Sequence, residues 1–285
     1  MTNGGAAESG DVAVPRPAAT VLLLRDAPDP DPGRSPLQVF LQRRVAGMAF
    51  AGGMTVFPGG GVDPGDRPDP ARWSGPDPQW WGRRLVCEPE LAGALVQAAV
   101  RETFEECGVL LAGRPDGATA LGPHLAPMLE AGREDLVARR HTLTDLLAAT
   151  GLVLRSDLLR AWARWITPPA SPRRYDTVFF TAIVPAGQQA DAATTEAVEA
   201  AWWHPAEALD RWRNGAIELM APTLRTLQQV AGFADAASVH AAAAQRTITP
   251  TIPKVRRQGD HVVVVVPGDP EYATAVDHLS PGGRP

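Results

Sequence analysis

Hydrophobic residues recur at strand spacing in the first third of the chain. Residues 19–26 (ATVLLLRD) are almost all apolar, which predicts a buried strand. Residues 37–44 (LQVFLQRR) alternate between aliphatic and other side chains, which predicts a second strand with two unlike faces. A third, short strand is predicted at residues 54–57, because the sequence PGGGVDPGD that follows forces tight turns.

The spacing of apolar positions becomes helical from Pro89 to about Glu106. Proline suits the first turn of a helix, and Gly108 stands where a residue in the left-handed conformation closes one. Residues 124–165 are also predicted to be mainly helical, since leucines recur along them with a break at Gly151. The remaining predicted elements are strands at 108–112, 175–185 and 196–205, helices at 205–215 and 221–235, and a valine-rich strand from residue 261.

This order of strands and helices predicts an α/β (α+β) fold. No break in composition divides the chain, so we expect a single domain over residues 17–272. Within it, the proline- and tryptophan-rich residues 63–88 are predicted to form an ordered surface insertion, and residues 113–160 a helical insertion. The small, polar residues 1–16 are predicted to be a disordered tail, and residues 273–285 a C-terminal tail.

The charge and composition of the chain exclude several classes of partner. Its 27 basic and 32 acidic residues form no block of like charge, so we expect neither nucleic acid nor a membrane surface as a partner. The two cysteines, Cys87 and Cys107, provide neither a disulfide framework nor a zinc site. No apolar run is long enough to span a bilayer and no signal peptide is recognised, so we expect a cytoplasmic protein. The sequence leaves open whether it forms a homodimer.

Three glutamates, Glu102, Glu105 and Glu106, crowd the end of the predicted helix. Their spacing places them on one helix face, where they continue an apolar stripe that includes Leu91 and Leu95. Like charges at this spacing destabilise a helix, and the helix dipole opposes anions at this end. Buried carboxylates are also costly unless a cation neutralises them. A hard divalent ion, Mg²⁺ or Mn²⁺, meets this need, because oxygen ligands suit it and no nearby histidine or thiolate pair indicates zinc.

The residues around these glutamates resemble the Nudix box. In the second half of that box, Arg-Glu, two residues, Glu-Glu, one residue and Gly precede an aliphatic position, and RETFEECGV (101–109) fits this pattern except at Thr103. The matching residues are Arg101, Glu102, Glu105, Glu106, Gly108 and Val109.

The first half of the box is displaced in this chain. At contiguous spacing a glycine is expected at position 87 and a glutamate at position 93, where the chain has Cys87 and Gly93. A similar stretch lies upstream in FPGGGVD (57–63), so the insertion separates the two halves. Glu88 and Glu90 are candidates for the missing glutamate.

Longer segments on both sides of the box resemble the peroxisomal Nudix branch that hydrolyses CoA and acyl-CoA. The resemblance covers most of residues 18–272. It implies the Nudix fold, a mixed β-sheet sandwiched between α-helices, and hydrolysis of a diphosphate bond, which for CoA yields phosphopantetheine, or its acyl form, and adenosine bisphosphate. The residues that match the CoA pattern before the box are Arg44, Gly53, Phe57, Pro58, Gly59 and Gly60, whereas Val45 and Ala49 depart from it. The sequence GGRP at the end is not a peroxisomal address, which favours a cytoplasmic relative.

This resemblance implies a catalytic or binding role for each candidate site residue. A diphosphate resists attack because its negative oxygens repel nucleophiles, so catalysis needs charge neutralisation and an activated water. We expect Glu102 and Glu106 to be direct metal ligands, and Glu105 to be a further ligand or the base that activates water. Arg101 is expected to orient one of these carboxylates, and Glu196 is a further candidate base or ligand. The candidate substrate contacts are Arg44, Gly59, Gly60, Arg173 and Arg174; a tight turn and surface exposure are the simpler explanations for the two glycines and for the last two arginines.

Three hypotheses of function remain open. The first is metal-dependent hydrolysis of CoA or acyl-CoA, small-molecule derivatives of a nucleoside diphosphate. The second keeps the chemistry but changes the substrate to ADP-ribose, a dinucleotide or a nucleoside triphosphate. The third is a nucleotide-sensing Nudix module without turnover, which the intact glutamates disfavour. For the glutamates themselves, the alternative is a solvated acidic helix end.

Overall fold

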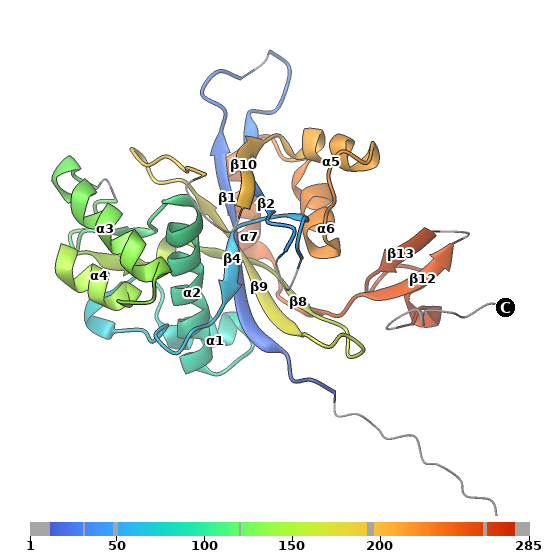
Figure 1. The fold of residues 1–285 in the computed structure, drawn as a ribbon, viewed down its shortest axis with the longest axis horizontal. Helices are drawn as coiled ribbons and strands as arrows, with labels where there is room; N and C mark the ends of the chain where they lie inside the picture. The colour runs from blue at the N-terminus through green and yellow to red at the C-terminus, as the bar shows by residue number, and fades with distance from the viewer. Residues whose placement is uncertain are drawn as a thin grey trace, which may run out of the picture.

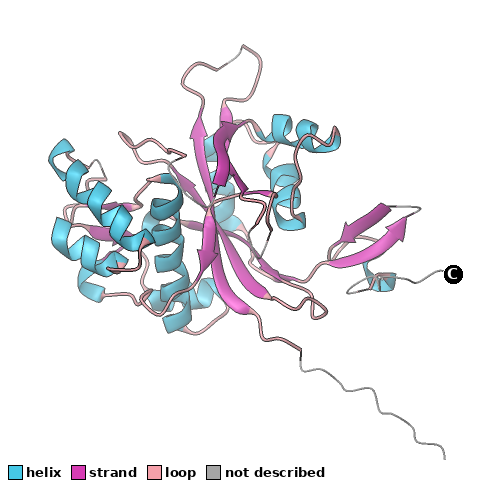
Figure 2. Cartoon of the chain, in the orientation of Figure 1, coloured by secondary structure: helices cyan, strands magenta, loops and turns pink. Residues whose placement is uncertain are grey.

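A mixed β-sheet runs through the centre of the molecule, and helices cover both of its faces (Figures 1 and 2). The computed structural model describes residues 12–30, 32–47, 51–119, 121–192, 197–258 and 261–276. The strands of this sheet are β1 (Arg16–Asp26), β2 (Leu37–Arg44), β3 (Thr55–Val56), β4 (Gly59–Gly61), β8 (Arg160–Ile166), β9 (Tyr175–Ile183), β10 (Ala197–Trp203) and β11 (Pro250–Thr251). Their order is β10-β2-β1-β9-β8-β11, with β3 paired to β2 and β4 paired to β1. The predicted mixed sheet between helices is confirmed.

The alternating side chains of β1 divide the core into two clusters, one on each face of the sheet. Val21 and Leu23 point to one face, and Leu22 and Leu24 point to the other. The first face is covered by α1 (Pro78–Leu85), α2 (Pro89–Cys107), α3 (Ala126–Val137) and α4 (Leu143–Thr150), and the second by α5 (Pro205–Arg213), α6 (Ala221–Val230) and α7 (Ala236–Gln245) (Figure 1). Because β1 is buried on both sides, it can be apolar at nearly every position.

Helix α2 forms where the sequence predicted it, and it carries the three glutamates. Pro89 occupies its first turn, where the missing N–H costs no hydrogen bond. Gly108 ends it in the left-handed conformation, with φ 71°, and donates its N–H to the carbonyl of Phe104 at 2.9 Å. The helix packs against β1 and against β4, the strand of glycines (Figure 1).

Residues 63–88 are ordered, as predicted, but they are not confined to the surface. Asp77 caps the start of helix α1, and its carboxylate accepts the N–H of Trp80. Trp81 and Leu85 have no exposed surface, and the Trp81 ring meets the ring of Phe180 edge to face at a centroid distance of 5.6 Å. The insertion in the box is therefore part of the core on the α2 side of the sheet.

Two stretches of the sequence prediction are wrong. Residues 108–112 do not join the main sheet; they lead into β6 (Ala112–Gly113), which belongs to a second sheet in the order β5-β7-β6 with β5 (Trp73–Ser74) and β7 (Val153–Arg155). The helical prediction for 124–165 is right for α3 and α4 but fails from residue 153, where β7 and β8 follow. The leucines of this stretch have helical spacing, yet burial of Trp162 and Trp165 against the α5–α7 side fixes it as a strand.

Among the elements of the C-terminal part that the sequence analysis missed are α7 and β12 (Lys254–Gln258). Helix α7 is mostly alanine, which gives a weak periodic signal, and it starts with a capping box between Asp235 and Ser238. The predicted valine-rich strand is β13 (His261–Val265), which pairs with β12 in a hairpin that projects from the body (Figure 1). The short 3-10 helices are η1 (Pro70–Arg72), η2 (Pro123–Leu125), η3 (Ser156–Leu158) and η4 (Tyr272–Thr274).

The predicted tails lie largely outside the described residues, which begin at Val12 and end at Val276. Strand β1 starts at Arg16, one residue before the predicted start of the domain. Within the described ranges, no helix combines the length and the apolar character that crossing a membrane requires.

Candidate active site

The glycine strand β4 and the acidic end of α2 meet, although 47 positions separate Gly59 from Glu106 in the sequence. The N–H of Gly59 donates to Glu106 Oε2 at 2.7 Å. Gly59 has φ 154°, and a Cβ there would come within 2.7 Å of the Cα of Thr20 on β1, so glycine is required at this position. The two separated halves of the box therefore form one site.

Strand β2 holds Glu106 from the sheet side. Gln42 Nε2 donates to Glu106 Oε2 at 2.7 Å, and Arg44 Nη1 lies 3.9 Å from Glu106 Oε1. Gln42 and Arg44 are two positions apart, so both side chains point to the same face of the strand. Gln42 is only 1% exposed: its Nε2 is satisfied by the carboxylate, whereas its Oε1 is buried without a hydrogen-bond partner.

Glu102 lies directly against Gly60. A Cβ on Gly60 would come within 2.8 Å of Glu102 Oε2 and closer still to Oε1. Glycine at this position therefore makes the space that the carboxylate occupies. Arg101 Nη1 donates to Glu102 Oε1 at 2.8 Å and to Glu105 Oε1 at 3.3 Å. Arg101 thus contacts both carboxylates at once.

Asp66, which the sequence analysis did not single out, is the main partner of Arg101. Arg101 Nε and Nη2 donate to its two carboxylate oxygens at 2.8 and 2.9 Å, and both side chains are almost fully buried. Asp66 follows Gly60 by six positions, the spacing that the box prescribes between its glycine and its glutamate. Counting from Gly60 would have found it.

The two acids proposed for that role lie elsewhere. Glu88 is the N-cap of α2 and Glu90 is in its first turn, whereas Glu102 is near the other end of this helix of 19 residues. At 1.5 Å per residue, about 18 Å of helix separates Glu90 from Glu102. Neither Glu88 nor Glu90 therefore reaches the site, and the geometry replaces them with Asp66.

Burial raises the pKa values of the acids in this site. It raises the pKa of Glu102 to about 7 and that of Glu106 to about 8, and repulsion from neighbouring carboxylates adds to the effect. The pKa of Glu105 is also raised, again chiefly by burial. Contacts with Arg101 and Gly59 oppose these shifts without cancelling them. Burial thus opposes the ionisation of all three acids more strongly than their contacts favour it.

The acids suit a divalent cation chemically, although the structure does not gather all three around one point. In the part of the chain that the structure describes, no group of three or more Asp, Glu, His or Cys side chains is arranged to hold a metal ion. The reason is that Arg101 draws Glu102 and Glu105 to itself, while Gln42 and Gly59 hold Glu106. Glu106 is nevertheless buried and the Glu102 side chain is only 14% exposed on the same helix face, and their mutual repulsion is one that a hard cation with oxygen ligands would relieve.

The structure brings some of the other predicted residues to the site and leaves others away from it. Arg44, Gly59 and Gly60 surround the glutamates, as described above. Arg174 lies between β8 and β9, where it donates to the backbone carbonyls of Thr167 at 3.0 Å and Ala13 at 2.7 Å. Its guanidinium therefore ties this hairpin to the segment before β1. Arg173 is exposed in the same connection. Glu196 lies outside the described residues.

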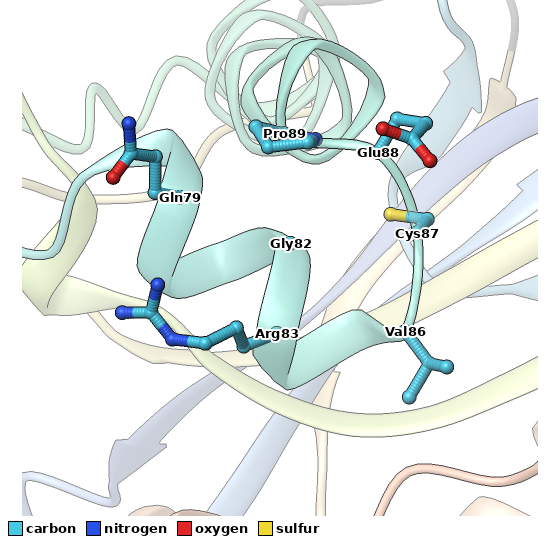
Figure 3. A pocket seen from close by; sticks show the side chains of 7 residues that line it. All are labelled: Gln79, Gly82, Arg83, Val86, Cys87, Glu88 and Pro89. Atoms are coloured by element: carbon cyan, nitrogen blue, oxygen red, sulfur yellow. The ribbon is translucent and has the colours of Figure 1, made fainter.

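Two hollows adjoin α2. One of about 250 Å³ lies at the acidic end, where Arg101 and Glu105 form part of its wall. The other, of about 730 Å³, is an open hollow at the opposite end, lined by Gln79 and Arg83 of α1 and by Glu88 at the start of α2 (Figure 3). Although larger, this second hollow is separated from the glutamates by most of the helix. The smaller cavity is therefore the one that belongs to the site.

Comparison with known families and proteins agrees with this geometry. The family model of the NUDT19 Nudix domain matches residues 89–230, from the start of α2 to the end of α6. The chain belongs to the Nudix hydrolase family. The acyl-coenzyme A diphosphatase NUDT19 of Xenopus laevis is 26% identical over 61% of this chain and 50% of its own length. The protein of the same name from Gallus gallus is 27% identical over 92% of this chain and 81% of its own length.

The matched region thus spans about half the length of the Xenopus relative and most of the Gallus relative. Among solved structures, the Nudix hydrolase of Alicyclobacillus acidocaldarius has a TM-score of 0.61 and 27% identity, with 84% of this chain and 100% of that chain covered. This match covers a larger share of the chain than the family model does. The predicted Nudix fold and the resemblance to the CoA diphosphatase branch are confirmed.

Proposed function

We propose that this Nudix chain is a divalent-metal-dependent diphosphatase whose substrate is CoA or an acyl-CoA. Hydrolysis adds one water across the P–O–P bridge and yields adenosine bisphosphate together with phosphopantetheine or its acyl form. The names of the two NUDT19 relatives support this substrate, and so does the resemblance of the segment before α1 to the CoA pattern.

The hydrogen bond from Gly59 to Glu106 is the observation that carries this proposal. Gly59 belongs to the segment that resembles the CoA pattern, and Glu106 belongs to the acidic end of α2. Arg44, from the same pattern, lies 3.9 Å from the same carboxylate. The pattern associated with the substrate is thus in direct contact with the acids associated with the chemistry.

In this proposal, Glu102 and Glu106 hold the ion, Mg²⁺ or Mn²⁺. When bound, such an ion neutralises diphosphate oxygens and makes water a stronger nucleophile at neutral pH. Arg101, fixed by Asp66, keeps the carboxylates of Glu102 and Glu105 in place.

Two further features of the site serve the same reaction. In this proposal the backbone of Gly59 and Gly60 lies beside the acids, so that phosphate oxygens of the substrate come close to it. Glu105, partly exposed and with its pKa raised by burial, is the proposed base that accepts a proton from the attacking water.

A panel of diphosphates tests the substrate. The purified chain is incubated with Mg²⁺ or Mn²⁺ and CoA, an acyl-CoA, ADP-ribose or a dinucleotide, and the products are identified by mass. We expect adenosine bisphosphate from CoA and acyl-CoA. Cleavage of ADP-ribose alone would contradict the CoA proposal, and the absence of turnover across the panel would favour a nucleotide-sensing module.

Glu106→Gln tests the acids. We expect kcat to fall at least about 100-fold, as when other groups that stabilise charge in a transition state are removed. The fold should persist, because glutamine resembles the protonated form of a carboxyl whose pKa is about 8 and still accepts a hydrogen bond from Gly59. Glu90→Gln, the same substitution in the first turn of α2, is the matched control and should keep the parent rate.

A further inference from the structure

The connection between α3 and α4 lines the cavity at the acidic end of α2. Its volume is about 250 Å³. Residues 63–66 of the insertion form one wall and residues 139–143 form the facing wall. A water needs only about 10–15 Å³ of such space, so the cavity has room for a ligand group. Since Glu105 lines the cavity and is also one of the three glutamates, this space adjoins the candidate active site.

Arg139, at the edge of this cavity, has a backbone conformation that does not suit it. It follows Ala138, the C-cap of α3, and its φ is 55°. This left-handed position after a helix is usually glycine, because a Cβ is strained there. Strain of this kind is often found at functional sites, and Arg139 combines it with a position at the edge of the cavity. Its side chain is therefore a candidate for a binding role.

The guanidinium of Arg139 reaches across the mouth of the cavity. Its Nη1 lies 3.2 Å from an oxygen of Asp63 on the facing wall, and the Arg139 side chain is 77% exposed. An ion pair as exposed as this one contributes little stability, so an anion of higher charge readily replaces Asp63.

The other charged groups around the cavity are held by neighbours. These contacts join Arg140 and His141 to Asp135, Arg101 to Asp66, and Thr142 to Asp145. Arg139 is thus the cation whose partner a ligand displaces most easily.

We propose that Arg139 binds a phosphomonoester of the substrate, separate from the diphosphate that is cleaved. This inference rests on the proposed function, because CoA carries such a group on its ribose and dephospho-CoA lacks it. A guanidinium donates two parallel hydrogen bonds to a phosphate, and a phosphate dianion competes well against the single charge of Asp63. Arg139 is therefore a specificity residue that distinguishes CoA from the same molecule without its third phosphate.

Arg139→Gly tests this role with CoA and dephospho-CoA as paired substrates. We expect kcat/KM for CoA to fall on the order of tenfold, mainly through KM, because one exposed charge-assisted contact is lost. The value for dephospho-CoA should stay at that of the parent. The melting temperature should not fall, since glycine adopts φ 55° without strain.

Two further variants separate binding from structure. Val86→Gly relieves the same strain at the C-cap of α1, where φ is also 55°, and should change neither kcat nor KM because it lies at the opposite end of α2. Asp63→Asn removes the competing carboxylate and should lower KM for CoA.

Three results would overturn the inference. The first is an equal loss on both substrates in Arg139→Gly, and the second is no loss on either. The third is that Asp63→Asn reproduces the defect of Arg139→Gly, which would make the ion pair itself the functional element. If the parent cleaves neither CoA nor dephospho-CoA, the proposed function is wrong, and this inference, which rests on it, is wrong as well.

Discussion

Gly60 and Gly61 are neighbours on β4, but they face different surroundings. A Cβ on Gly60 would collide with the carboxylate of Glu102, whereas the nearest atom to a Cβ on Gly61 is the carbonyl oxygen of Pro17 at 3.9 Å. We expect Gly60→Ala to displace Glu102 and lower kcat at least about tenfold, the loss seen when a group that orients a metal ligand is removed. Gly61→Ala should keep most of the activity.

Circular dichroism of both alanine variants controls for folding, and steady-state kinetics with CoA measures the effect. Equal activity of the two variants would contradict the role of Gly60 as the space for Glu102.

At the scale of residues, the sequence predicted the acids better than their partners. Glu102, Glu105 and Glu106 follow from their own spacing on a helix. Gln42 and Asp66 do not, because a single polar residue in a strand or a loop shows no sign that it is buried until its partner is known. Asp66 was findable only through its spacing from Gly60.

Helix α1 gives the clearest prediction at the scale of elements. Trp81 is fully buried between α1 and the sheet, whereas its neighbour Trp80 is 38% exposed. Trp81→Ala should lower the free energy of unfolding by about 3–5 kcal/mol, the usual cost of removing a large buried aromatic side chain. Trp80→Ala is the matched control and should cost about 1 kcal/mol or less. Urea unfolding measures both, and equal costs would mean that the insertion is not part of the core.

A histidine in helix α7 should make the free energy of unfolding depend on pH. Burial against β9 lowers the pKa of His240 to about 4, and the His240 Nδ1 lies 3.1 Å from the hydroxyl of Thr181. The unfolded chain, with a histidine pKa of about 6.5, therefore binds a proton at pH values where the folded chain does not. Stability that is present above about pH 6.5 is lost as the pH falls towards 4.

Between pH 7.5 and pH 5 this loss should be about 1–2 kcal/mol, reduced somewhat by the partial exposure of the ring. Urea unfolding at the two pH values measures this loss of stability in the parent and in His240→Gln. The loss should be absent from His240→Gln. His124→Gln, at an exposed position, should retain it. An unchanged pH dependence in His240→Gln would contradict the assignment.

The elements themselves were predictable where local signals were strong. Pro89 and Gly108 fixed both ends of α2, and the alternation in residues 37–44 fixed β2. Strand β8 and helix α7 were not predictable, because leucine spacing and alanine-rich composition are compatible with more than one structure until tertiary packing selects one. Helix α1 was hidden by the prolines around it.

The whole molecule explains why the two halves of the box can be separated in sequence. Pairing of β4 with β1 and packing of α2 on the same strand bring Gly59 to Glu106, and this geometry is independent of how many residues connect them. The long connection folds into α1 and fills the core beside α2. The order of elements predicted the class of fold, but only the assembled sheet identifies which glycines and which acids share a site.

The central claim is that the glutamates at the end of α2 bind a divalent ion. Titration of the metal-free chain with Mn²⁺, followed by electron paramagnetic resonance, tests it without reference to any substrate. We expect Mn²⁺ to bind the parent and Glu90→Gln and to raise the melting temperature of both. Glu106→Gln should bind the ion far more weakly. Equal binding by the parent and Glu106→Gln, or no binding by the parent, would contradict the claim.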